Sequence, residues 1–310
     1  MAGSMRVAGA GLLRTILFTV FTVSMPSLDA QVIPSLLDAD GRPALFGTPA
    51  VRIVALAPSL TELVFAAGAG DKLIAVSDYS DYPEAARKLP VVANAAGISW
   101  ESVIALRPDL VLAWKGGTRP ADIARLNSLG INVFSIEIKR LDDVVGALRA
   151  IGKLVGRPDP ADAAARIFLK ELAALRETNA TKPVVNTYMQ ISAKPLMTIN
   201  RDHVISEMIG LCGGVNVFAD APTLVSEPSR EELFSRRPDA ILFGTNKFSE
   251  KSPNPAVYAD LPAARVGRIH GVTADHVFRP GPRLILAAAE ICAALDRVRT
   301  LHTEEKQSKR

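Results

Sequence analysis

The chain has 310 residues, of which 48% are hydrophobic, 22% charged and 5% aromatic, and its formal net charge is +4. This composition is typical of a globular protein and excludes a collagen, a coiled coil or a disordered chain. Apart from a cluster at 306–310, the basic residues are scattered along the sequence rather than gathered in a stripe. With so few aromatic side chains to stack on bases, the composition argues against nucleic acid as a partner.

Residues 1–30 have the pattern of a secretory signal peptide. Two arginines give a positive flank, an apolar run follows at 15–23, and a small-residue cleavage site ends at Ala30. The run is too short to cross a bilayer, which favours a cleaved signal over a membrane anchor. We therefore predict an exported chain that is cleaved near Ala30 and begins with a short N-terminal segment over 31–51.

The sequence has two cysteines, Cys212 and Cys292. In an exported protein an even number of cysteines favours a disulfide, which here would close a long loop from the middle of the chain to its last helix. The alternative is a pair of buried free thiols.

Strand-like and helix-like segments alternate from residue 52 onwards, with short loops between them. In chain order the predicted elements are a strand at 52–57, a helix at 60–67, a strand at 73–76, a helix at 100–106, a strand at 110–114, a helix at 120–129 and a strand at 132–136. Such alternation is typical of a parallel sheet covered by helices. We predict an N-terminal α/β lobe over 52–140.

The segment 141–178 differs from the rest because its apolar residues recur at helical spacing. Prolines at 158 and 160 predict a kink in this long helical stretch, which would link two lobes. Alternation resumes with a strand at 183–189, so a second α/β lobe is expected over 179–300. The last residues, 301–310, are expected to form a polar tail.

The second half of the chain repeats a motif of the first. Ser, Glu, Arg, Pro and Asp occur at the same positions in Ser99–Asp109 and Ser229–Asp239, 130 residues apart, and an apolar strand follows each copy. A weaker echo relates 61–68 to 206–213. The repeat predicts two similar α/β lobes, and because ligands of open parallel sheets bind beyond the carboxyl ends of the strands, we expect the ligand cleft between the lobes.

Three aromatic residues follow predicted strands at the edge where this cleft is expected. Trp114 ends one strand, and Tyr79 and Tyr82 lie in the loop after another. Aromatic side chains at such positions are good walls for a large, partly apolar ligand. The alternative is structural, with Trp114 packed between the lobes and Tyr82 closing a turn.

The repeated motif also carries two acidic residues, Glu101 and Glu231, each in the first turn of a predicted helix after a serine that can cap it. Both can be purely structural, since acidic residues complement the helix dipole and Ser229 with Glu232 fits a capping box. Their equivalent places on two lobes favour a second role, as paired anchors for arginines on a two-fold partner.

Sequence signatures of enzymes are missing. The chain has no phosphate-binding loop, no complete dinucleotide fingerprint and no nucleophile elbow, and its four histidines lack the spacing of a zinc site. We predict no catalytic residue, no metal and no cofactor.

From Arg52 to about Leu295 the chain resembles the periplasmic substrate-binding proteins of ABC importers, and within them the cobalamin-binding branch. The stretches that carry the resemblance are Ser77–Pro83, Leu106–Gly117, Cys212–Phe218 and Pro282–Ala288. The Arg-Pro-Asp element belongs to the wider superfamily, whereas Tyr-Ser-Asp-Tyr-Pro and Ala-Trp-Lys-Gly-Gly are narrower and favour the cobalamin branch. The resemblance implies a monomeric periplasmic protein that delivers cobalamin or a related corrinoid to an inner-membrane permease with its ATPase.

By position, the resemblance implies specific roles for residues of this chain. It implies Tyr79 and Trp114 as ligand contacts, Glu101 and Glu231 as permease-docking residues, and a Cys212–Cys292 disulfide. It adds a ligand-binding segment that the residues alone do not suggest, namely Asp275, His276, Val277, Phe278 and Arg279.

The chain also departs from the pattern of the cobalamin branch. Two aromatic positions of that branch fall on Ala95 and near Val225 here, and the haem-binding relatives have a tyrosine near Ala95 that this chain lacks. The departures leave a related corrinoid open as the ligand and make haem a weaker candidate. The alternatives to a corrinoid carrier are a ferric siderophore or haem carrier, an exported hydrolase, and an orphan sensor without a transporter.

Overall fold

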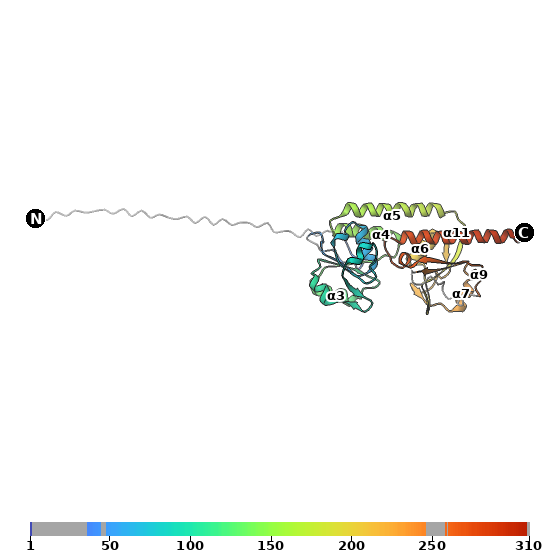
Figure 1. The fold of residues 1–310 in the computed structure, drawn as a ribbon, viewed down its shortest axis with the longest axis horizontal. Coiled ribbons are helices and arrows are strands. Elements are labelled where there is room, and N and C mark those ends of the chain that lie inside the picture. Colours follow the sequence, from blue (N-terminus) through green and yellow to red (C-terminus); the bar gives the residue numbers. More distant parts are fainter. Residues whose placement is uncertain (2–35, 45–47, 246–257, 259, 309–310) are drawn as a thin grey trace.

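The protein is described here by a computed structural model that places residue 1 and residues 36–44, 48–245, 258 and 260–308. The predicted signal peptide and the start of the mature chain lie outside these described residues. Figure 1 shows two lobes side by side, each built on its own sheet, with a long helix running along one side of both. The predicted fold class, two α/β lobes with parallel sheets, is confirmed.

The N-terminal lobe contains a six-stranded sheet in the order β4-β3-β2-β1-β5-β6, parallel except for the β3–β4 pair. Its strands are β1 (Ile53–Ala55), β2 (Leu73–Ser77), β3 (Val91–Asn94), β4 (Gly97–Ile98), β5 (Leu110–Trp114) and β6 (Val133–Ile136). Its helices are α1 (Pro58–Ala66), η1 (Gly70–Lys72), η2 (Glu84–Lys88), α2 (Trp100–Leu106) and α3 (Pro120–Ser128). Both α1 and α3 begin at a proline, whose fixed φ suits the first helical position.

The C-terminal lobe contains a parallel four-stranded sheet in the order β10-β7-β12-β13, beside a small antiparallel sheet in the order β11-β9-β8. Its strands are β7 (Val185–Gln190), β8 (Ser192–Ala193), β9 (Leu196–Ile199), β10 (Gly214–Asn216), β11 (Val225–Ser226), β12 (Ala240–Thr245) and β13 (Ile269–Thr273). Its helices are α6 (Val204–Leu211), α7 (Arg230–Arg236), α9 (Pro262–Arg265), α10 (Ala274–Val277) and α11 (Leu284–Ser308).

The sequence repeat corresponds to a repeat in structure. Helices α2 and α7 each begin after the repeated serine and end at an arginine in the left-handed conformation, with φ of 47° at Arg107 and 46° at Arg237. The aspartates that follow perform the same task in the two lobes. Asp109 accepts a hydrogen bond from the backbone N–H of Arg52 at 2.9 Å, and Asp239 from that of Asn186 at 3.0 Å. Each aspartate thus ties its motif to the start of a central strand.

The helical stretch between the lobes differs from the predicted kinked helix. It forms two separate helices, α4 (Leu141–Leu154) and α5 (Pro158–Asn179), that pack extensively against one another. The chain reverses in the short turn between them, where Gly156 takes a positive φ of 67° and Pro158 starts the new helix. Only α5 therefore runs from the first lobe towards the second (Figure 1).

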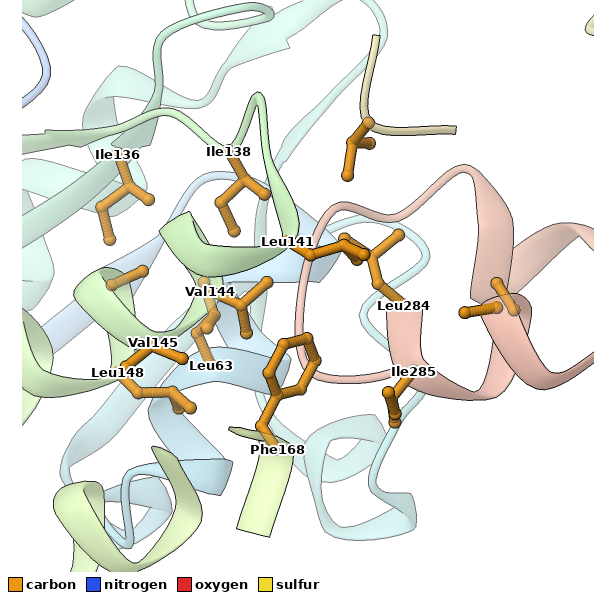
Figure 2. Packing of buried hydrophobic residues seen from close by; sticks show 14 of the residues in the cluster. Leu63, Ile136, Ile138, Leu141, Val144, Val145, Leu148, Phe168, Leu284 and Ile285 are labelled. Carbon is orange, nitrogen blue, oxygen red and sulfur yellow. The ribbon is translucent and has the colours of Figure 1, made fainter. Parts of the chain in front are cut away.

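The described residues form three clusters of buried hydrophobic side chains, and one of these cores extends through both lobes. It lies between the sheets and an inner layer formed by α1, α4, α5, α6 and α11. Figure 2 shows its centre, where Leu63 of α1, Val144 of α4, Phe168 of α5 and Leu284 of α11 converge. Because the same apolar cluster contains side chains from both lobes, burial of apolar surface holds the lobes together.

The Cys212–Cys292 disulfide joins α6 to α11 inside this core. Helix α11 then continues to Ser308, so residues 301–308, expected as a polar tail, extend the last helix. No helix in the part of the chain that the structure describes is both long and apolar enough to cross a membrane.

The cap of α6 gives a prediction about pH. Nδ1 of His203 accepts a hydrogen bond from the backbone N–H of Ile205 at 3.2 Å, and burial lowers the pKa of His203 below 6.5. The unfolded chain then binds the proton more readily, so this stabilisation is present above pH 6.5 and is lost as the pH falls through the lower pKa of the folded state. Asparagine caps helices without titrating. We expect the unfolding temperature to drop between about pH 7 and 5 by more in the parent than in His203→Asn; equal drops would contradict this role for His203.

Candidate functional site

The site predicted from the sequence lies at the carboxyl ends of the parallel strands. Tyr79 is in the loop after β2, and Trp114 is the last residue of β5. In the other lobe, the segment Asp275–Arg279 follows β13 directly. In parallel α/β sheets this edge is where ligands bind.

The indole of Trp114 folds back over the turn that follows it. A Cβ atom on Gly117 would lie 2.2 Å from the ring, and one on Gly116 would lie 3.0 Å from it. The backbone N–H groups of Gly117 and Thr118 both donate to the carbonyl oxygen of Trp114, at 3.0 and 2.7 Å. The two glycines therefore allow a tight turn that holds the ring in place while 37% of the residue stays exposed.

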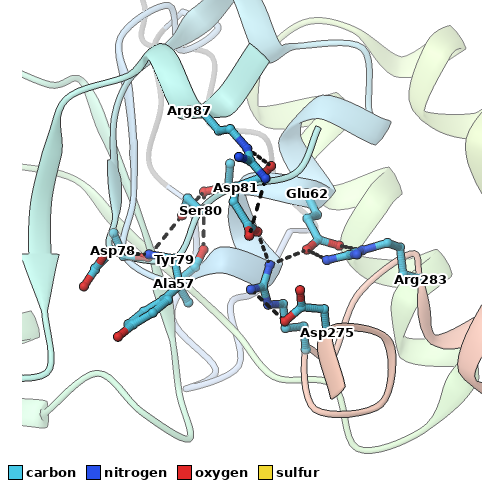
Figure 3. A network of polar contacts seen from close by, with 12 residues as sticks. Ala57, Glu62, Asp78, Tyr79, Ser80, Asp81, Arg87, Asp275 and Arg283 are labelled. Carbon is cyan, nitrogen blue, oxygen red and sulfur yellow. Dashed lines mark hydrogen bonds and ion pairs between the residues drawn. The ribbon is translucent and has the colours of Figure 1, made fainter. Parts of the chain in front are cut away.

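Tyr79 projects from a strained turn. Its φ is +61°, which is rare for a bulky residue, and its backbone N–H donates to Oδ1 of Asp78 at 2.8 Å. The turn leaves Tyr79 72% exposed, and in Figure 3 its ring points away from the neighbouring charged residues. Sparsely populated backbone conformations often occur at binding sites, which supports a functional reason for this one.

A cavity of about 160 Å³ opens next to the Trp114 turn, between the β3–β4 loop and the start of α3. Ala95 is in its wall, at the place where the cobalamin branch has an aromatic residue, and Arg119 forms its rim together with Asp122. Nε of Arg119 lies 2.8 Å from Oδ2 of Asp122. Val225, at the other departure from the branch, is in β11 and 38% exposed.

The segment Asp275–Arg279 presents both apolar and charged groups. The ring of Phe278 packs on Gly244 at the end of β12, where a Cβ atom would lie 2.2 Å from it, and Phe278 remains 39% exposed. Nδ1 of His276 lies 2.7 Å from the carboxylate of Glu290, so this ring is held by α11. Val277 is buried in the core.

A cluster of charged side chains joins this segment to the N-terminal lobe, as Figure 3 shows. Nη1 of Arg279 lies 2.6 Å from Oδ1 of Asp81 and 3.5 Å from Oε1 of Glu62, and Nη2 lies 2.9 Å from Oδ1 of Asp275. Arg283 binds both carboxylate oxygens of Glu62 and lies over the Tyr82 ring at 4.4 Å.

Neighbouring charges in this cluster shift the pKa values of Asp81 and Arg283. Burial alone would raise the pKa of Asp81, but the hydrogen bond and charge of Arg279, with help from Arg87, hold it below its ordinary value. Burial would lower the pKa of Arg283, and its pairing with Glu62 outweighs this effect and raises it. Both shifts favour the charged forms of Asp81 and Arg283.

The sequence alone does not single out Glu62, Asp81 or Arg283 as members of the site. One signal was available, because a glutamate within the apolar helix run 60–67 has to find a partner when that helix is buried. The partner could not be read from the sequence, since Glu62 and Arg283 are 221 positions apart.

Glu101 and Glu231 lie on the surface, one in the first turn of α2 and the other in the first turn of α7. Within the described part of the chain, the Glu101 carboxylate has no hydrogen-bond or ion-pair partner. Hydrogen bonds from its own backbone N–H and from Ser229 hold the pKa of Glu231 below its ordinary value. Ser229 caps α7 as predicted, through the N–H of Glu232 at 3.0 Å, whereas the hydroxyl of Ser99 pairs with that of Ser102.

Among the described residues, no three His, Cys, Asp or Glu side chains gather where they could hold a metal ion. The candidate site consists of exposed aromatic side chains at strand ends and a cluster of paired charges.

Comparison with known proteins relates this arrangement to a family. The model of the periplasmic binding protein family matches residues 53–275. The vitamin B12-binding protein of Vibrio cholerae serotype O1 is 36% identical over 247 residues, which cover 80% of this chain and 90% of that protein. The crystal structure of the periplasmic vitamin B12 binding protein of Vibrio cholerae matches with a TM-score of 0.75 and 35% identity, over 81% of this chain and 98% of that one.

A heme-binding protein is also among the similar structures. The periplasmic heme-binding protein from Roseiflexus sp. RS-1 matches with a TM-score of 0.70 and 25% identity, over 80% of this chain and 98% of that one. The family match covers most of the chain and ends at Asp275, and the relatives span both lobes. This chain belongs to the periplasmic binding protein family.

Proposed function

We propose that this protein is the substrate-binding component of an ABC importer, that it captures cobalamin or a related corrinoid in the periplasm, and that it has no catalytic activity. The observation that carries the proposal is its similarity, along four-fifths of the chain, to relatives named for vitamin B12 binding. The proposed ligand needs no cofactor or metal of the protein's own. After removal of the signal peptide near Ala30, the protein acts as a monomer.

The proposed ligand contacts are Tyr79, Trp114 and the segment Asp275–Arg279, except for the Val277 side chain, which is buried in the core. Three of these aromatic or apolar groups are exposed at the strand ends, namely Tyr79, Trp114 and Phe278. Asp275 and Arg279 add an acceptor and donors beside them. A corrin has broad apolar faces and amide-bearing edges, and mixed lining of this kind suits both. An aromatic residue at position 95 would fill the cavity beside Ala95, and with alanine there the cavity leaves room for an edge of the ligand.

The ligand class is tested by the absorption band that stays with the protein. The mature chain is mixed with cyanocobalamin, haemin or a ferric hydroxamate and passed through a desalting column. The proposal predicts that only the cobalamin band elutes with the protein. Retention of an iron chelate alone would keep the fold and replace the ligand, and turnover of generic esters or phosphates by the purified protein would favour the exported hydrolase.

The proposed partner is an inner-membrane permease with its ATPase, and Glu101 and Glu231 are its docking residues. Their support is the equivalent placement of two exposed carboxylates on α2 and α7, which suits arginines on a two-fold partner. We expect the double variant Glu101→Ala/Glu231→Ala to bind ligand as tightly as the parent and to lose at least about tenfold in uptake by cells or vesicles that contain the transporter.

A matched control for docking is available on the same helix. Glu232 in α7 is also exposed, but it pairs with Arg236 of its own helix. Glu232→Ala should therefore leave uptake close to that of the parent. If the docking pair weakened ligand affinity instead, or if Glu232→Ala impaired uptake equally, the docking assignment would be wrong.

A further inference from the structure

Two glutamates occupy equivalent places in the two lobes, and each contacts the start of a helix that follows the sheet of the other lobe. Glu62 is on α1, the helix after the central strand β1, and Glu207 is on α6, the corresponding helix of the second lobe. They are also partners in the weak sequence echo between 61–68 and 206–213. Helix α4 follows β6, the last strand of the N-terminal sheet, and α11 follows β13 of the C-terminal sheet after the short helix α10.

The contact made by Glu62 is almost fully buried. Only 2% of its side chain is exposed, and its carboxylate binds Nε of Arg283 at 2.8 Å and Nη2 at 2.5 Å. Arg283 itself is 11% exposed. A bidentate pair of this kind fixes both the distance and the angle between the groups that it joins.

The contact made by Glu207 uses the start of a helix. Its Oε2 accepts a hydrogen bond from the backbone N–H of Leu141, the first residue of α4, at 2.9 Å. Its Oε1 lies 3.1 Å from Nη2 of Arg140. The carboxylate therefore satisfies an N–H at the positive end of α4 while joining the second lobe to the first.

The Glu62 contact also reaches the candidate ligand site. Arg279 lies beside Glu62 and contacts Asp81, in the loop that carries Tyr79, and Asp275, in the segment after β13 (Figure 3). Arg279 thus links the loop that carries Tyr79 to the segment after β13, and Glu62 lies beside this link. Apolar side chains in place of the ion pair would bind the lobes equally well, because a buried ion pair adds little net stability over hydrophobic packing. The ion pair, however, fixes one arrangement of the lobes.

We propose that Glu62 and Glu207 are positioning residues that hold the two lobes in one relative orientation. By doing so they set the width of the ligand cleft and the spacing between Glu101 and Glu231. The role in ligand binding rests on the function proposed above, whereas the role in lobe orientation does not.

The orientation can be measured without any ligand. Cysteines introduced at Ser128 in α3 and at Val266 after α9, both exposed and on different lobes, carry spin labels whose separation is measured by pulsed electron spin resonance. The parent should give one narrow distance distribution. Glu62→Gln and Glu207→Gln should each shift or broaden it, and the double variant should do so most.

The matched control removes an ion pair within one lobe. Asp220→Asn breaks the 2.6 Å contact with Arg236 and should leave the distribution unchanged. Glu207→Gln keeps the proposal testable if Glu62→Gln fails to fold, because Arg140 is largely exposed. A distribution that stays narrow and unshifted in folded Glu207→Gln and in folded Glu62→Gln would overturn the proposal.

Ligand binding gives a second readout that separates this proposal from the proposed function. If only about a tenth of the double variant holds the competent orientation, its apparent Kd for cyanocobalamin rises about tenfold. Unchanged affinity together with a broadened distribution would overturn the role in setting the cleft. Failure of the parent to bind cyanocobalamin would overturn the proposed ligand. The distance measurement would still test the role of the two glutamates in lobe orientation.

Discussion

Replacing Cys212 and Cys292 by serine should lower the free energy of unfolding by about 4–5 kcal/mol, because the disulfide closes a loop of 80 residues and so restricts the unfolded chain. The two sulfur atoms lie in the core between α6 and α11, where burying serine hydroxyls in apolar surroundings adds a further cost. Urea unfolding of the parent and of the double serine variant measures the difference.

A reducing agent provides the control for this experiment. It should destabilise the parent towards the level of the serine variant and leave the serine variant unaffected. If the parent and the variant unfolded at the same urea concentration, the disulfide would not contribute to stability. The sequence supported a disulfide through export and an even cysteine count, and the structure pairs the same two residues.

Replacing Trp114 by alanine should weaken cyanocobalamin binding by about ten- to hundredfold, the loss expected when one large aromatic contact is removed. Because Trp114 is 37% exposed and packs on its own Gly116–Gly117 turn, the fold itself should be little affected. Calorimetric titration measures the affinity without relying on the tryptophan signal that the substitution removes.

Two variants control for this effect. Trp114→Phe keeps an aromatic face and should retain most of the affinity. Trp100→Phe changes the chain's other tryptophan, the first residue of α2, and should bind like the parent. The guanidinium carbon of Arg125 lies 4.2 Å from the centre of the Trp100 ring. An unchanged Kd in Trp114→Ala would remove Trp114 from the ligand site.

Local patterns in the sequence predicted most elements of both lobes. The helix at 100–106 and the strand at 110–114 begin and end where the structure places α2 and β5. Both are bounded by strong signals, a serine before the helix and an Arg-Pro-Asp turn before the strand. The duplicated motif predicted two similar lobes because it recurs with its following strand.

The packing of α4 against α5 could not be predicted from the same patterns. Apolar spacing shows that a segment is helical, but a proline is compatible with a kink as well as with the start of a new helix. The reversal depends on Gly156 in a positive-φ conformation and on burial against the opposite helix. The polar residues at 301–308 suggested a tail outside the last helix. A helix that is buried at its start can, however, continue at the surface even where the sequence has few apolar residues.

Only the part of the candidate site that depends on local sequence patterns could be predicted. Aromatic residues at strand ends can be located from the chain order alone, and the structure places Tyr79 and Trp114 at the carboxyl edge of the sheet as expected. The charged cluster around Glu62 cannot, because it joins α1 to the start of α11 across the lobe boundary. Contacts between residues so far apart become visible only when the lobes are packed together.

The central claim is tested most directly by titrating the mature protein with cyanocobalamin, haemin and a ferric hydroxamate in parallel, following tryptophan fluorescence. Only Trp100 and Trp114 report, and Trp114→Phe controls for absorption of light by the coloured ligands. The account predicts saturable binding of one cyanocobalamin, at micromolar concentration or below, and none of the others. Saturable binding of haemin or the ferric hydroxamate with no response to cyanocobalamin would contradict it.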